Sequence, residues 1–166
     1  APDLTVKAAK GDEDTAIDLD ISTALTDLDG SETLSEITFS NVPKGALLSA
    51  GIDNNDGTWS VDADDLSGLT ITPFDDSDAD FELGLSVTAT DTKGVTATTT
   101  TSLPVTVVAV ADTPGLSVSD AAGSEDTAID LDIKSLLTDT DGSETLSITI
   151  ADVPEGAKFS SGTDNN

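Results

Sequence analysis

Several residue types are missing from the sequence. It contains no cysteine, histidine, methionine or tyrosine, and only one tryptophan and four phenylalanines among 166 residues. Without cysteine no disulfide can stabilise the fold, and without cysteine or histidine a zinc site is not expected. Because aromatic side chains are so scarce, the hydrophobic core must be built from valine, isoleucine, leucine and alanine.

Basic residues are also rare. Six lysines and arginines stand against 33 acidic residues, which gives a formal net charge of -27. Nucleic acid is excluded as a partner because it binds to basic surfaces, and an anionic membrane surface is disfavoured for the same reason. Two explanations of the charge are open: it keeps the protein soluble, or bound divalent cations neutralise part of it.

Long apolar runs are missing as well. No segment approaches the roughly 18 consecutive apolar residues of a membrane-spanning helix, so we expect no membrane insertion. No signal peptide is visible either. Either the segment is internal to a longer chain, or an export signal lies elsewhere in that chain.

The chain contains an internal repeat. The motif GDEDTAIDLDI begins at Gly11, and GSEDTAIDLDI begins at Gly123, 112 positions later. The 25 residues that start at these two glycines are identical at 20 positions, and the similarity continues to Asn166 with one extra residue in the first copy. We therefore expect residues 1–112 to form one complete repeat and residues 113–166 to form the N-terminal half of a second.

The second repeat lacks an equivalent of residues 56–112. Half of a layered β-fold cannot bury both of its faces alone. Two arrangements are open: residues 113–166 are a truncated piece of a longer array, or a second copy of the chain completes them by swapping or pairing. Such similar neighbours are typical of long, quasi-one-dimensional arrays, so neighbouring repeats of the same chain are the expected partners.

Hydrophobic residues alternate with polar ones, and this period of two predicts β-strands. The longest run extends from Phe81 to Ala89, and shorter runs lie at 17–21 and 103–107. Turn-forming pairs such as Asp29-Gly30 and Lys93-Gly94 separate the runs. About seven short strands in roughly 110 residues predict an all-β fold, an immunoglobulin-like antiparallel β-sandwich with Greek-key connections.

Trp59 is the single tryptophan and follows the turn Asp56-Gly57-Thr58. Two roles are open for it. It could be a platform on which a sugar stacks, or an apolar anchor of the core on the strand after the turn. The second role, that of a core anchor on the strand after the tight turn, is favoured.

Acidic residues collect where the predicted strands begin or end. The clusters are Glu13-Asp14 with its repeat Glu125-Asp126, the D-x-D-G-S-E motifs at 27–32 and 139–144, residues 75–80, Asp91 and Asp112. Calcium prefers about six to eight oxygen ligands from flexible loops, and residues i and i+2 of an extended segment point the same way. Aspartate is also common in solvated turns, but five clusters at strand ends favour Ca2+ as the cofactor.

The order of these motifs resembles that of cadherin repeats, and more closely that of the cadherin-like repeats of large bacterial adhesins of the RTX type. Glu13 precedes Asp27 by 14 positions, much as an early glutamate precedes a D-x-D pair in cadherins. The segment 89–94 resembles the cadherin A-x-D-x-G turn, and the segment 109–114 resembles the D-x-N-D-x-P linker. Each motif is short, and their shared order carries the resemblance.

Two features depart from the cadherin pattern. Ala109 and Ala111 stand where the linker motif has its first Asp and its Asn, so Asp112 is the carboxylate that the linker keeps. No L-D-R-E motif occurs, and Asp76 and Asp78 lie where its acids would be. A junction of this kind is expected to hold fewer ions than a full cadherin junction.

The resemblance implies calcium ligands at both ends of the first repeat. At the junction between the repeats, the ligands would be Glu13, Asp76 and Asp78 of the first repeat, Asp112 of the linker, and Asp139 and Asp141 of the second. Asp27, Asp29 and Asp91 would form the other end of the first repeat, facing a preceding module. Glu125, the equivalent of Glu13 in the second repeat, completes the set of candidate ligands.

The resemblance further implies a secreted extender repeat at the bacterial cell surface, which projects distal binding domains for adhesion and biofilm formation. Calcium would stiffen each junction of the array. A carbohydrate-binding or cell-surface-binding module is the alternative, and it would use Trp59 and the loop 53–56. An enzyme is not expected, because the acids recur at repeated turns and do not converge on one cleft as a pair of hydrolytic carboxylates would.

Overall fold

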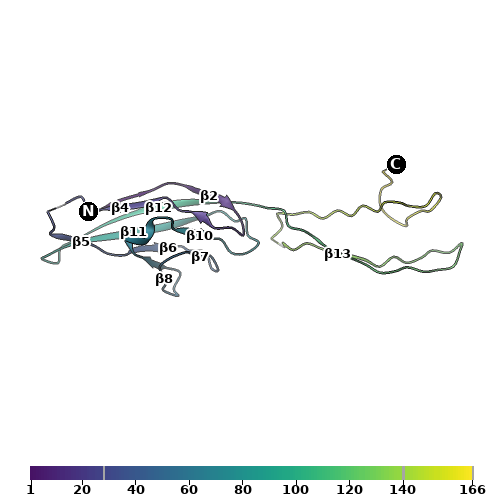
Figure 1. Cartoon of the computed structure of the whole chain (residues 1–166), viewed down its shortest axis with the longest axis horizontal. Helices are drawn as coiled ribbons and strands as arrows, with labels where there is room; N and C mark the ends of the chain where they lie inside the picture. Colours follow the sequence, from purple (N-terminus) through teal and green to yellow (C-terminus); the bar gives the residue numbers. More distant parts are fainter. Residues whose placement is uncertain (28, 140, 166) are drawn as a thin grey trace.

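The computed structural model describes residues 1–27, 29–139 and 141–165. Within these ranges the regular structure is β-strand, apart from the short 3-10 helix η1 (Ala63–Leu66), so the predicted all-β class is confirmed. The described ranges contain no helix that is long and apolar enough to cross a membrane. The molecule is elongated: the strand-rich first repeat lies at one end, and the described residues of the second repeat, 113–139 and 141–165, extend away from it (Figure 1).

The largest sheet of the first repeat is centred on a long hairpin. β11 (Phe81–Asp91) and β12 (Thr96–Val108) pair antiparallel from Phe81↔Val105 to Thr90↔Thr96. The other antiparallel strands of this sheet are β5 (Glu32–Leu34), β6 (Ile37–Ser40), β9 (Trp59–Val61) and β8 (Ile52–Asp53). β2 (Ala9–Asp12) pairs with the end of β12 in parallel, so the expectation of a purely antiparallel fold is wrong at this edge.

Two smaller sheets complete the first repeat. One contains β1 (Asp3–Val6) and β4 (Ile21–Ala24), and the other contains β3 (Ile17–Asp18), β10 (Thr70–Thr72) and β7 (Leu47–Leu48). The alternating run at 17–21 is therefore divided between two sheets. Ile17 pairs with Ile71 of β10, whereas Ile21 pairs with Val6 of β1.

Side chains from all of these sheets share one hydrophobic core. Leu83, Leu85 and Val87 of β11 are buried, as the alternation along this strand predicts. Each fully buried side chain of this size contributes about 1.5–3 kcal/mol to folding. Trp59 is half-buried and packs against the same core, which favours its role as an apolar anchor over that of a sugar platform.

The second repeat keeps local pairings of the first repeat without its core. β13 (Gly115–Val118) and β14 (Ile133–Leu136) pair in the same register as β1 and β4, 112 positions earlier. Ile17 is 2% exposed, but its equivalent Ile129 is 46% exposed. In the first repeat Ile17 pairs with β10, which belongs to the part that has no equivalent in the second repeat.

Candidate metal centre at the junction of the repeats

Acidic loops of the two repeats meet around the linker. β12 ends at Val108, and residues 109–112 lead from it into the second repeat. The turn after β2, the loop between β10 and β11, and the D-x-D-G-S-E loop of the second repeat lie together here. Segments that are more than 60 positions apart in the sequence therefore form one site.

Hydrogen bonds inside the D-x-D-G-S-E motif orient its carboxylates. The Asp141 N–H donates to Asp139 Oδ1 at 2.7 Å, and the Ser143 N–H donates to Asp141 Oδ1 at 2.7 Å. The equivalent bonds of the first repeat, from Asp29 N–H to Asp27 Oδ1 and from the Ser31 N–H to Asp29 Oδ1, are 3.1 and 2.8 Å long. Aspartate favours such turns with its own backbone, so the local sequence shapes this loop before any partner is present.

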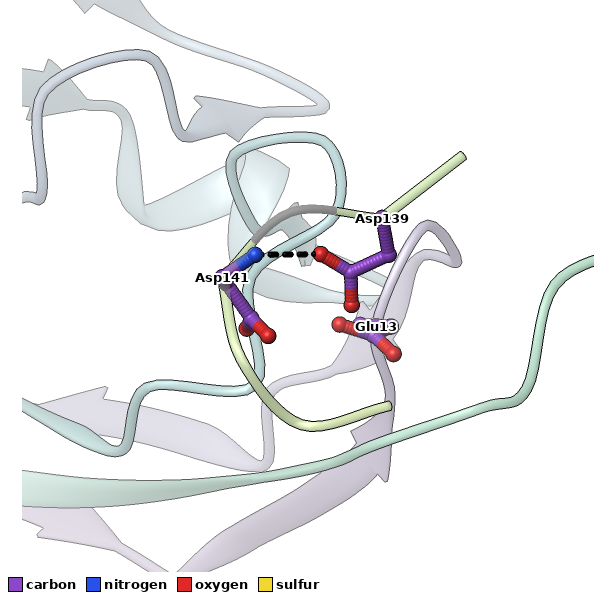
Figure 2. Close-up of side chains that lie close together, drawn as sticks. All are labelled: Glu13, Asp139 and Asp141. Atoms are coloured by element: carbon purple, nitrogen blue, oxygen red, sulfur yellow. Dashed lines mark hydrogen bonds between the residues drawn. The ribbon is translucent and has the colours of Figure 1, made fainter. Parts of the chain in front are cut away.

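A first group of carboxylates spans the two repeats. Glu13, Asp139 and Asp141 each place one carboxylate oxygen so that the three atoms lie within 4.8 Å of one another. Glu13 and Asp139 are each 2% exposed. Figure 2 shows the three side chains converging, Glu13 from the first repeat and the two aspartates from the second.

Glu13 is buried with only one of its oxygens satisfied. Its Oε1 accepts a hydrogen bond from the Val110 N–H at 2.6 Å, while Oε2 has no hydrogen-bond partner among the described residues. The Val110 bond lowers the pKa of Glu13, but burial and the charges of Asp139, Asp14 and Asp141 outweigh it and raise the pKa above its ordinary value. A buried carboxylate in such company is costly unless a positive charge compensates it.

A second group lies beside the first. One carboxylate oxygen from each of Asp14, Asp76 and Asp112 lies within 4.8 Å of the other two. The Asp76 N–H donates to Asp14 Oδ1 at 2.8 Å, and both residues have left-handed backbones, with φ of 57° for Asp14 and 55° for Asp76. Aspartate tolerates this conformation better than most residues. Partial burial, followed by the charges of Asp14, Asp112, Asp139 and Asp75, raises the pKa of Asp76.

Asp78 lies next to the first group. Its N–H donates to Asp141 Oδ2 at 3.3 Å. Desolvation, then the charge of Asp141, raises the pKa of Asp78, while the hydrogen bonds from Ser143 lower the pKa of Asp141. The six candidate ligands that the resemblance assigned to the junction are thus found around it, five in the two groups and Asp78 beside them.

The remaining predicted ligands do not lie at the junction. Asp91 pairs with Glu32 where β11 meets β5, at the far end of the first repeat, and its Oδ1 accepts the N–H groups of Lys93 and Val95 in a turn. Among the described residues, no group of three close ligands includes Asp27, Asp29, Asp91 or the exposed Glu125.

Two junction residues were not among the predicted ligands. Asp14 belongs to the second group, and the repeated Glu-Asp pair was the sequence signal that could have revealed it. Glu144 accepts the Asp112 N–H through Oε1 at 2.5 Å, and its buried Oε2 has no hydrogen-bond partner in the described ranges. Its signal was the last position of the D-x-D-G-S-E motif, which is occupied by glutamate in both repeats.

The candidate ligand atoms at the junction indicate which kind of ion the site suits. All of them are oxygens, and they come from loops, which is the preference of hard cations such as Ca2+. Comparison of the chain with protein-family models, with curated proteins and with solved structures finds no match.

Proposed function

We propose that the chain is a calcium-stiffened extender repeat of a bacterial cell-surface adhesin of the RTX type, built as a cadherin-like, immunoglobulin-like Greek-key sandwich. It would hold distal binding domains away from the cell for adhesion and biofilm formation. The observation that carries the proposal is the buried Glu13, which has one unpartnered carboxylate oxygen and lies in one group with Asp139 and Asp141 of the next repeat. A cation bound there has ligands from both repeats and ties them together.

Without a cation the junction is unstable by its own charges. Two carboxylates 4.8 Å apart repel by about 3.5 kcal/mol at an effective dielectric constant of about 20. The buried pair Glu13 and Asp139 lies within that distance. The repeats would therefore separate and the linker would bend, whereas a bound Ca2+ would replace this repulsion by attraction.

The expected affinity suits a change between compartments. Extracellular calcium modules commonly bind with dissociation constants of about 10⁻⁴–10⁻³ M. Such a site is filled outside a cell and empty in the cytosol. The array would be pliable before export and would stiffen at the cell surface.

The test is a distance measurement across the junction. The absence of cysteine allows spin labels to be attached at two introduced positions, Thr100→Cys on β12 and Ser117→Cys on β13, both of which are exposed. Pulsed electron paramagnetic resonance should give a broad distribution of distances between the labels in chelator and a narrow one in calcium. The calcium concentration should be about 10 mM, which is above the usual dissociation constants of such sites. A distribution that magnesium narrows equally would indicate charge screening, and one that calcium leaves broad would refute stiffening.

The alternative function, a carbohydrate-binding module, has less support. Trp59 packs against the core. The side-chain amide of Asn54 donates to the hydroxyl oxygens of Thr58 and Ser60, at 3.0 and 3.2 Å. The loop that would bind a sugar is thus occupied with its own hydrogen bonds.

A further inference from the structure

One glutamate from each repeat holds the linker. Glu13 of the first repeat accepts the Val110 N–H, and Glu144 of the second repeat accepts the Asp112 N–H. Hydrogen bonds from amides to carboxylates are about twice as strong as neutral ones. The two glutamates therefore fix alternate amides of the linker, one from each side of the junction.

Glu144 is a charged side chain, yet one of its carboxylate oxygens is buried. It borders a hollow that Ala111, Pro114, Leu137 and Leu146 also line. One of its oxygens is out of contact with water and has no hydrogen-bond partner among the described residues. The hydrogen bond from the Asp112 amide to Oε1 is partly buried, and such a bond is stronger than one exposed to water, so it is well suited to hold the chain in place.

Asp112 is the residue that gains from this contact. It supplies the linker's carboxylate to the second group, where Asp76 and Asp14 are already joined by a hydrogen bond within the first repeat. The backbone at Asp112 has to be fixed for its side chain to meet those two. Glu144 provides that restraint from the second repeat.

We propose that Glu144 is a positioning residue, which completes the Asp14–Asp76–Asp112 cation site by holding the backbone of Asp112. This inference rests on the proposed function, because it requires a cation at that site. Glu144 acts through Asp112 and is not itself a ligand. The second repeat thus contributes to both groups, directly through Asp139 and Asp141 and indirectly through Glu144.

The test compares the calcium affinities of variants of the whole 166-residue chain, measured by competition with a chromophoric chelator. Residues that orient metal ligands typically change affinity by about 10–100-fold when removed, so Glu144→Ala should weaken one class of site about tenfold. Glu144→Gln should stay within about threefold of wild type, because its carbonyl oxygen still accepts the Asp112 N–H. Glu32→Ala is the matched control, since Glu32 ends the same motif in the first repeat, away from the junction.

A double-substitution cycle separates positioning from a general structural effect. If Glu144 acts through Asp112, Glu144→Ala should cost no further affinity in a chain that already carries Asp112→Ala. Additive losses would overturn the inference, and so would a Gln variant as weak as the Ala variant, since the charge would then be what matters. If Glu144→Ala binds calcium as tightly as wild type, the positioning role is refuted but the proposed function is not. If the wild-type chain binds no calcium, the proposed function itself is refuted. The unfolding transition of the first repeat in chelator should be unchanged in every variant.

Discussion

Replacing Glu13 by glutamine should have opposite effects on stability with and without calcium. Glutamine keeps the shape of glutamate, and its carbonyl oxygen can still accept the Val110 N–H. In chelator the substitution removes a buried negative charge from beside Asp139 and Asp141. The variant should therefore be at least as stable as wild type under that condition.

In calcium the same substitution removes a charged ligand. A site with a dissociation constant of about 10⁻⁴ M stabilises the folded state by about 2.7 kcal/mol at 10 mM calcium, a hundredfold excess. For a domain of about 100 residues this corresponds to a rise of roughly 10–20 °C in melting temperature. If Glu13→Gln weakens binding about a hundredfold, the remaining gain is about 0.4 kcal/mol, or a few degrees.

Thermal unfolding followed by circular dichroism measures both effects, with magnesium as a second control. Glu125→Gln is the matched variant, because Glu125 occupies the same motif but is exposed and lies away from the two carboxylate groups. It should behave as wild type in both conditions. A Glu13→Gln variant that retained the full calcium-dependent rise would refute a cation at this group. Equal destabilisation in chelator and in calcium would mean that Glu13 acts only through its bond to the linker.

Three further predictions concern the junction and the fold. Asp139→Asn should abolish most of the calcium-dependent rise in melting temperature, whereas Asp27→Asn, in the same motif at the exposed end, should leave it intact. In chelator, the melting temperature should rise as the pH falls from 7 toward 4.5, because the raised pKa of Glu13 makes the folded state take up its proton before the unfolded state does; a flat profile would contradict this. Gly51→Ala should destabilise the first repeat by about 2–4 kcal/mol, since φ is +98° and a Cβ would lie 2.6 Å from the Ser60 carbonyl oxygen. Gly162→Ala, at the equivalent position with open space around it, should leave that transition unchanged, as chemical denaturation of both variants would show.

The sequence predicted the strands of the first repeat better than their assignment to sheets. The alternation from Phe81 to Ala89 identified β11, because alternate side chains of a strand point to the same face and one face of β11 is buried. The alternation from Ile17 to Ile21 continues through a point where the chain passes from one sheet to another. A period of two reports which side chains face the core, and both sheets face the same core, so the crossing leaves no trace in the pattern.

The candidate ligands could be predicted in kind, but their environment could not. The motifs at 27–32 and 139–144 are nearly identical and share two hydrogen bonds from backbone amides to aspartate carboxylates. Asp139 is buried against Glu13 while Asp27 is exposed. The reason is that, in the described part of this structure, the second motif packs against the end of the first repeat at the junction and the first motif has no such neighbour. Glu144 escaped prediction because its partner is a backbone amide, and every residue except proline has one.

The division of ligands between repeats predicts how calcium dependence should change with the length of an array. Stability in a repeat protein is approximately the sum of terms for each repeat and terms for each interface. The first carboxylate group takes residues from both repeats, and the second group includes Asp112 of the linker. Calcium should therefore contribute to the interface term alone. A fragment of residues 1–108 keeps the buried core, which extends from Ala9 to Val107, but it lacks Asp112, Asp139 and Asp141. It should unfold cooperatively at a temperature that 10 mM calcium, a concentration above the usual range for such modules, raises no more than magnesium does. Screening of an acidic surface would act on the fragment as strongly as on the longer chain, and a calcium-specific rise in the fragment would show that the ion binds within a repeat and not between repeats.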